Sequence, residues 1–253
     1  MNRINVLLKK KKISIITCYD ATFSNLLERC KCDAALVGDS LGIVIKGEKN
    51  TRKVTIDEII YHTRAVRLGS STLPIISDMP LSALKTKNEA LLNARALINA
   101  GADMIKIEGG TSMFAIVKFL SENKIKICAH IGYIPQTMNK PSTKVDSEKS
   151  LKIAKALEGN GAQMIVLSMM GSETDKLLTE KLTIPTIAFR SSNLCTGNVE
   201  IIYDLIGVTS KFFKVKKDKF SNKPISCMTA IIKFIESTKK ITDGYSRNHP
   251  RHS

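Results

Sequence analysis

The chain has 253 residues, 43% of them hydrophobic, which is enough for one large core and suits the size of a single α/β barrel. Its formal net charge is +16, but the lysines are scattered, and only Lys9–Lys12 and Lys214–Lys219 form dense patches. No apolar run approaches the roughly 20 residues that cross a bilayer, so we do not expect a membrane protein.

The cysteines and aromatic residues indicate whether the chain is a cysteine-metal protein or a nucleic-acid-binding protein. Cys30 and Cys32 form a lone Cys-X-Cys pair, so the 6 cysteines lack the paired spacing of a metal site and are expected to be reduced thiols. Aromatic residues make up 5% of the chain and do not alternate with the basic residues as in RNA-binding motifs. We therefore expect a cytoplasmic protein, and nucleic-acid binding stays a minority hypothesis.

Short apolar runs alternate with helical segments along the chain. Lys12–Tyr19 is a β-branched run that predicts a first strand, and Asp20 is placed to cap the helix that follows it. Ala34–Gly42 begins with an apolar run that Gly38 stops, as expected of a strand buried on both faces. Further strands are predicted over 74–78, 104–108, 125–130, 164–168, 185–189 and 199–205.

Helices are predicted after most of these strands. Thr55 and Glu58 have the spacing of a capping box, and the helix that they begin continues through Val66. The other predicted helices cover 21–29, 88–100, 112–121, 173–182 and 226–237, and a long polar loop covers 132–146. This alternation predicts a single-domain (β/α)8 TIM barrel over residues 1–242, followed by a disordered tail over 243–253.

Acidic side chains stand at the ends of three successive predicted strands. They are Asp39, Asp78 and Glu108. In a closed parallel barrel the carboxyl ends of all strands open onto one face, so these residues would share a pocket. Carboxylate oxygens suit Mg²⁺, which keeps several waters and takes few protein ligands. We therefore predict a magnesium site, although each carboxylate alone is equally typical of a helix cap or a loop contact.

Two basic side chains accompany these carboxylates. Lys106 lies two residues before Glu108, so the pleat points both toward the same side of the strand. Inside a barrel it would hold an anionic substrate, and the alternative is a structural counter-ion to Glu108. His130 ends the fifth strand, where it would bind a substrate oxygen or transfer a proton, unless it is a structural histidine.

With these residues assembled, the chain resembles the ketopantoate hydroxymethyltransferase family over nearly its full length. No single motif is decisive, but their order and spacing together are specific to the family. The matching segments are TCYDA (17–21), LVGDSLG (36–42), VTIDEIIYHTRAV (54–66), SDMP (77–80), GADMIKIEGG (101–110), AHIGYIPQ (129–136) and VLSM (166–169).

The resemblance implies a homo-oligomeric barrel enzyme, typically a decamer, that uses Mg²⁺ and 5,10-methylenetetrahydrofolate. It implies hydroxymethyl transfer to 3-methyl-2-oxobutanoate through a Mg²⁺-chelated enolate, giving 2-dehydropantoate (ketopantoate) for pantothenate and coenzyme A synthesis. By motif, Asp39 and Asp78 bind the metal and Glu108 completes its environment. The residues implied to bind the substrate are Asp39, Ser40, Asp78, Lys106 and His130.

Three departures from the family pattern concern the remainder of the pocket. Ser168 stands where family members carry the glutamate proposed as general base, and a hydroxyl cannot do that work unaided near neutral pH. Ala188–Ser192 replaces a glycine-rich segment, and Tyr203-Asp204 replaces a His-Asp pair. Metal and keto-acid binding are thus expected to persist, with Ser168 as a weakened catalytic position.

Two hypotheses therefore remain open beside an active but slowed enzyme of this family. One is a remnant that folds and assembles without turnover, which the loss of the substrate C3 proton in deuterated water would exclude. The other is a related Mg²⁺-dependent barrel lyase that acts on another 2-oxo acid, which a panel of substrates would reveal.

Overall fold

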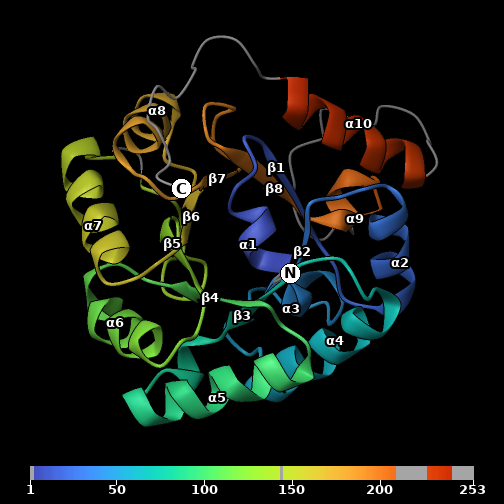
Figure 1. Ribbon diagram of the computed structural model, residues 1–253, viewed down its shortest axis with the longest axis horizontal. Helices are drawn as coiled ribbons and strands as arrows, with labels where there is room; N and C mark the ends of the chain where they lie inside the picture. The colour runs from blue at the N-terminus through green and yellow to red at the C-terminus, as the bar shows by residue number, and fades with distance from the viewer. Residues whose placement is uncertain (1–2, 143–144, 209–226, 241–253) are drawn as a thin grey trace.

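The computed structural model describes residues 3–142, 145–208 and 227–240. Within them, parallel strands pair in sequence order and the last closes onto the first, which confirms the predicted (β/α)8 barrel (Figure 1). The strands are β1 Ile13–Thr17, β2 Ala34–Val37, β3 Ile75–Met79, β4 Met104–Glu108, β5 Ile127–Gly132, β6 Met164–Ser168, β7 Thr186–Phe189 and β8 Gly197–Glu200. The tail predicted over 243–253 lies outside the described residues.

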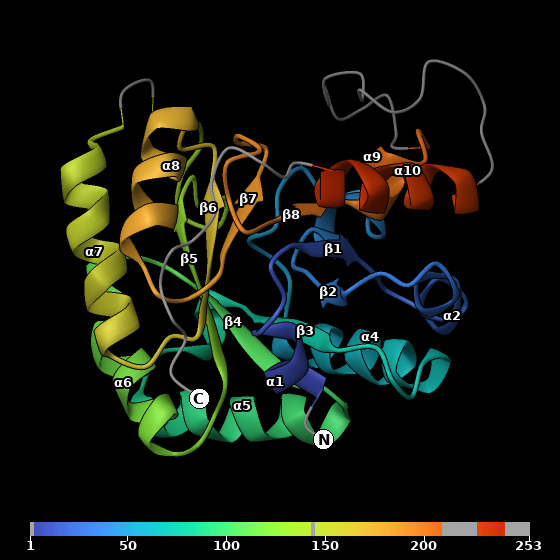
Figure 2. The same ribbon diagram turned by 45° about the horizontal axis from the view of Figure 1, so that its top comes forward.

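Helices surround this barrel. They are α1 Arg3–Leu7, α2 Ala21–Arg29, α3 Leu41–Val44, α4 Ile56–Gly69, α5 Lys87–Ala100, α6 Phe114–Glu122, α7 Ser147–Gly159, α8 Ser172–Lys181, α9 Ile202–Leu205 and α10 Cys227–Lys240. Both views place α4 to α8 and α10 on the outside of the barrel (Figures 1 and 2). Among the described helices, none has the length and apolar character needed to cross a membrane.

Local sequence signals determine where several helices begin and end. The predicted capping box of α4 is present, because Thr55 Oγ1 accepts the Glu58 N–H and the Glu58 carboxylate accepts the Thr55 N–H. Asp20 caps α2 as predicted, accepting the Phe23 N–H at 2.9 Å. Gly101 ends α5 with a φ of 118°, a left-handed conformation that favours glycine.

The interior of the barrel is a hydrophobic cluster separate from the layer beneath the helices. Inward-facing residues such as Ile15, Met104 and Val166 form this inner cluster. Ile4 and Leu7 of α1 are buried in the same cluster, so α1 covers the N-terminal end of the barrel. Sequence analysis did not predict α1, because a helix of five residues without a polar cap carries almost no helical signal.

The eighth strand is shorter than the prediction of Val199–Leu205, and that part of the prediction is wrong. β8 ends at Glu200, the last residue paired with β1, and residues 202–205 form α9. Past this point the Ile202 N–H donates to Thr17 Oγ1 at 3.0 Å. A side chain has therefore replaced the neighbouring strand as hydrogen-bond acceptor, and the extended run stops.

Candidate active site

The polar side chains predicted to share a pocket lie inside the barrel at the carboxyl ends of the strands. Inward positions on a strand are two residues apart, so Met104 in the inner cluster places Lys106 and Glu108 above it on the same face. The inward polar side chains are Asp78 on β3, Lys106 and Glu108 on β4, His130 on β5 and Ser168 on β6, all of them buried. The predicted grouping of distant strand ends is therefore present.

The three predicted carboxylates form one compact cluster. Each of Asp39, Asp78 and Glu108 offers an oxygen, and these oxygens lie within 4.8 Å of one another. The Asp39 N–H donates to Asp78 Oδ2 at 2.9 Å, which fixes the turn after β2 against β3. Burial and the negative charges of Glu108 and Asp78 raise the pKa of Asp39 well above its usual value. A bound cation would relieve this repulsion.

Lys106 lies between two members of the cluster. Its Nζ donates to Asp78 Oδ1 at 2.8 Å and to Glu108 Oε1 at 3.1 Å. Burial alone would lower the pKa of Lys106, but the charges of Asp78, Glu108 and Asp39 outweigh it and raise the pKa. These charges favour the protonated form of Lys106, and the ion pair with Glu108 that the counter-ion alternative expects is present.

His130 is oriented by the same carboxylate. Its Nδ1 lies 2.8 Å from Glu108 Oε1, and its buried Nε2 has no hydrogen-bond partner in the described part of the chain. Burial raises the pKa of Glu108, but Lys106 and His130 lower it more, so Glu108 is ionised and can only accept. The Nδ1 atom therefore carries a proton, and its hydrogen bond to Glu108 fixes the orientation of the imidazole ring.

Ser168 occupies the end of β6 with nothing bound to its hydroxyl. The side chain is fully buried, and within residues 3–142, 145–208 and 227–240 its Oγ has no hydrogen-bond partner. The neighbouring strand approaches closely, because a Cβ on Gly132 would lie 2.2 Å from the Ser168 carbonyl oxygen. Ser168 thus points a neutral hydroxyl into the barrel interior, at a position where the neighbouring backbone leaves little room.

Ser40 belongs to a hydroxyl network that sequence analysis missed. Its Oγ lies 2.8 Å from the hydroxyl of Tyr19, which lies 2.9 Å from Thr17 Oγ1. Tyr19 follows β1 just as Asp78 and Glu108 end their own strands. The same strand-end rule would have found it, but a tyrosine beside an apolar strand is also an ordinary core residue.

The segment Ala188–Ser192 at the end of β7 contacts its neighbours through side chains. Ser191 Oγ accepts the N–H groups of Met170 and Gly171 at 3.2 and 3.1 Å, directly after β6. Arg190, with a φ of 48°, pairs with Asp204 at 2.8 Å. These contacts connect the segment at the end of β7 to the residues that follow Ser168 and to Asp204.

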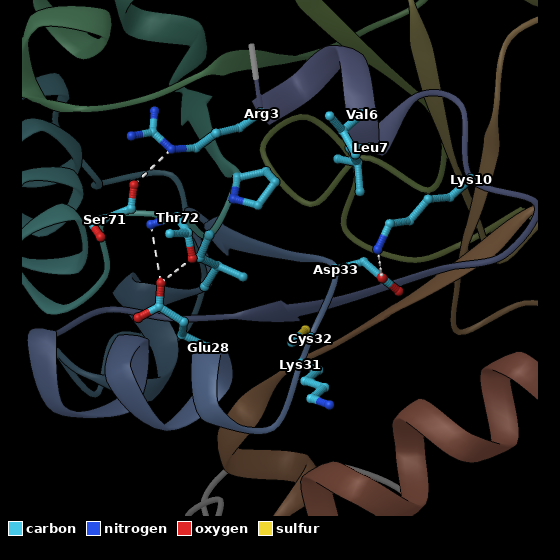
Figure 3. Close-up of a pocket in the computed structure, with 12 residues that line it drawn as sticks. Arg3, Val6, Leu7, Lys10, Glu28, Lys31, Cys32, Asp33, Ser71 and Thr72 are labelled. Carbon is cyan, nitrogen blue, oxygen red and sulfur yellow. Dashed lines mark hydrogen bonds and ion pairs between the residues drawn. The ribbon is translucent and has the colours of Figure 1, made fainter. Parts of the chain in front are cut away.

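A pocket of about 640 Å³ lies at the opposite end of the barrel, beside α1 (Figure 3). On its wall, Lys10 Nζ pairs with Asp33 Oδ1 at 2.5 Å, and Glu28 accepts hydrogen bonds from Ser70 and Thr72. None of the predicted site residues lines this pocket. The candidate active site is therefore the carboxylate cluster at the other end.

Comparison with known proteins supports the assignment of the chain to a family. The model of the ketopantoate hydroxymethyltransferase family matches residues 2–242. The 3-methyl-2-oxobutanoate hydroxymethyltransferase of Nitrosospira multiformis is 43% identical over 208 residues, which cover 79% of each chain. The protein of the same name from Vibrio parahaemolyticus is 35% identical over 244 residues, which cover 92% of each chain.

Solved structures with lower identity share the fold. A phosphoenolpyruvate phosphomutase from Streptomyces platensis subsp. rosaceus has a TM-score of 0.65 at 13% identity, covering 80% of this chain and 81% of that one. A phosphonopyruvate hydrolase in complex with oxalate and Mg²⁺ has a TM-score of 0.59 at 10% identity, covering 74% and 70%. The match to the family model, by contrast, extends over nearly the whole sequence, and the chain belongs to the ketopantoate hydroxymethyltransferase family.

Proposed function

We propose that the protein transfers a hydroxymethyl group from 5,10-methylenetetrahydrofolate to 3-methyl-2-oxobutanoate, making ketopantoate for pantothenate synthesis. The family match and the names of its relatives support this reaction. The observation that carries the proposal is the buried triad of Asp39, Asp78 and Glu108, with Lys106 paired to two of its members. A buried cluster with more carboxylates than lysines is costly unless another cation joins it.

Mg²⁺ is the cation that we propose for this cluster. Asp39 Oδ2 and Glu108 Oε2 are buried and have no hydrogen-bond partner among the residues that the structure describes, so oxygen ligands are available to a hard divalent ion. Asp39 and Asp78 would hold the metal directly, and Glu108 would complete its environment. Bound Mg²⁺ supplies a Lewis acid that polarises the keto group and makes the C3 proton of the substrate more acidic.

The chain's own residues would bind and orient the keto acid. Lys106 would bind the substrate carboxylate as a buried ammonium group, and Ser40 contributes a hydroxyl beside the Asp39 turn. His130 Nε2 has no hydrogen-bond partner among the described residues and is the ring nitrogen that would bind a substrate oxygen or transfer a proton. Ser168 can do neither with the strength of a carboxylate, and we propose that proton abstraction is slowed for this reason.

The resemblance also supports a larger assembly. We propose a homo-oligomer, typically a decamer in this family, built from one barrel domain over residues 1–242. Sedimentation analysis of the full chain would measure the assembly. A monomer at micromolar concentration would contradict this part of the proposal.

Replacing Lys106 with methionine is expected to weaken binding of 3-methyl-2-oxobutanoate about 10–100-fold in the presence of Mg²⁺. The substitution removes a hydrogen bond from a buried charged donor, which is worth about 1.5–3 kcal/mol. Calorimetric titration with the keto acid measures the effect. Lys118→Met, which removes an exposed lysine on α6, is the matched control and should bind like the wild type.

Thermal unfolding followed by circular dichroism decides which role of Lys106 dominates. In the Mg²⁺-loaded protein the metal balances Asp78 and Glu108, so a modest change in melting temperature is expected for Lys106→Met. A large destabilisation with unchanged keto-acid affinity would instead make Lys106 a structural counter-ion.

Exchange of the C3 proton of 3-methyl-2-oxobutanoate in deuterated water tests the proposed function. The wild-type protein with Mg²⁺ should exchange this proton faster than buffer with Mg²⁺ does, and chelation of the metal should abolish the difference. No exchange by protein that demonstrably binds metal and keto acid would favour the non-catalytic remnant.

A further inference from the structure

We infer that Tyr19 is a positioning residue for keto-acid recognition: its hydroxyl holds the hydroxyl of Ser40 in place to meet the substrate. The inference rests on the proposed function, in which Ser40 contacts the keto acid. Tyr19 itself lies behind Ser40, buried to 2% exposure. It would therefore act through Ser40 and does not need to touch the substrate.

Aromatic rings from two helices contact the Tyr19 side chain. Its ring stacks on Tyr203 with a centroid separation of 5.9 Å and an interplanar angle of 13°. The edge contact to His62 has a centroid separation of 6.4 Å, and His62 Nδ1 lies 2.7 Å from the Tyr19 carbonyl oxygen. These contacts come from α4 and α9, on either side of β1 in the fold. The position of the phenol oxygen is thus fixed independently of Ser40.

Ser40 depends on this phenol oxygen for its own position. Ser40 precedes α3 but makes no side-chain cap to it, although serine commonly does so. Among the described residues, Tyr19 is the hydrogen-bond partner of Ser40 Oγ, at 2.8 Å. The adjacent backbone is already fixed, because the Asp39 N–H donates to Asp78. The remaining freedom of Ser40 is its hydroxyl rotor, and Tyr19 restrains it.

The hydroxyl protons of Thr17, Tyr19 and Ser40 determine the direction of each hydrogen bond in this network. The Tyr19 hydroxyl has one proton and lies between Ser40 Oγ and Thr17 Oγ1, and Thr17 Oγ1 also accepts the Ile202 N–H. The Tyr19 O–H donates to Thr17 Oγ1, so the Ser40 hydroxyl donates to Tyr19, and the phenol oxygen fixes the direction of the Ser40 rotor. Burial raises the pKa of Tyr19, so the phenol stays protonated and keeps its hydrogen bond to Thr17 as the donor.

A double-mutant cycle tests whether Tyr19 acts through Ser40. The variants are Tyr19→Phe, Ser40→Ala and the two combined, and the readout is the calorimetric Kd of 3-methyl-2-oxobutanoate with saturating Mg²⁺. Tyr19→Phe keeps the stacked ring and should raise the Kd about 3–10-fold, as expected for loss of one hydrogen bond. The combined variant should bind no more weakly than Ser40→Ala, because the restraint is useless without the serine hydroxyl.

Tyr61→Phe is the matched control, since it removes the hydroxyl of an exposed tyrosine on α4 outside the proposed site. It should change the Kd by less than about twofold. If Tyr19→Phe does not fold, Thr17→Val removes the other partner of the phenol and enters the same cycle with Ser40→Ala. Unchanged affinity in the phenylalanine variant, or additive losses in the combined variant, would overturn the inference. A wild-type protein that binds no keto acid would instead overturn the proposed function, and the inference with it.

Discussion

Ser168→Glu is expected to speed exchange of the C3 proton of 3-methyl-2-oxobutanoate by about 10²–10⁴-fold, the usual contribution of a positioned general base. Ser168 points into the barrel interior from the end of β6, and its buried Oγ has no partner to lose among the described residues. A carboxylate there would supply the proton acceptor that the chain lacks at this position. Proton NMR in deuterated water, with Mg²⁺ present, measures the rate for both forms.

Ser168→Gln is the matched control, because it adds nearly the same bulk without a carboxylate. The close approach of Gly132 leaves little room, so both variants should lose some stability, which thermal melts would measure. Acceleration in the glutamate variant alone identifies the carboxylate as the missing group. A wild-type rate as fast as that of Ser168→Glu would mean that water, His130 or another group already supplies the base. No exchange in either form, with ligands bound, would mean that the Ala188–Ser192 segment has also disabled the site.

Asp39→Asn and Asp78→Asn should each weaken Mg²⁺ binding by more than about 10–100-fold, the loss typical of removing even an outer-shell partner. An all-oxygen site with few protein ligands loses much of its charge with either carboxylate. Calorimetric titration with Mg²⁺ in the presence of keto acid measures the affinity. Asp57→Asn, on the exposed first turn of α4, makes the same charge change away from the cluster and is the control.

Melting temperatures distinguish whether Asp39 is a metal ligand or a carboxylate that stabilises the fold. Burial and the neighbouring carboxylates raise the pKa of Asp39, so its ionised form is unfavourable in the metal-free fold. Asp39→Asn should therefore leave the metal-free melting temperature unchanged or higher, and it should abolish the increase that Mg²⁺ gives. Wild-type affinity for Mg²⁺ in both variants would remove the proposed metal site.

Much of the site could be predicted from the sequence, because a parallel barrel converts order along the chain into proximity. An apolar run followed by a polar residue marks a strand end, and the two-residue pleat then places Lys106 on the same face as Glu108. The rule needs no knowledge of tertiary contacts. Asp39, Asp78 and Glu108 accordingly lie together as predicted.

What escaped prediction depends on contacts between distant segments. The end of β8 is decided by Thr17 on β1, which accepts the Ile202 N–H and so halts the extended run. The role of Tyr19 depends on Ser40, 21 residues away in the chain. The burial of α1 depends on the open end of the barrel that it covers. None of these partners is visible in the local pattern of residues.

The most direct test of the proposed function is formation of ketopantoate by the wild-type protein from 3-methyl-2-oxobutanoate and 5,10-methylenetetrahydrofolate. We predict ketopantoate formation with Mg²⁺, none after chelation, and recovery when Mg²⁺ is restored. Ser168→Glu should increase the rate of product formation. Metal-independent product would contradict the role given to Asp39, Asp78 and Glu108. Absence of product in both the wild type and Ser168→Glu, with Mg²⁺ and keto acid bound, would contradict the proposed reaction itself.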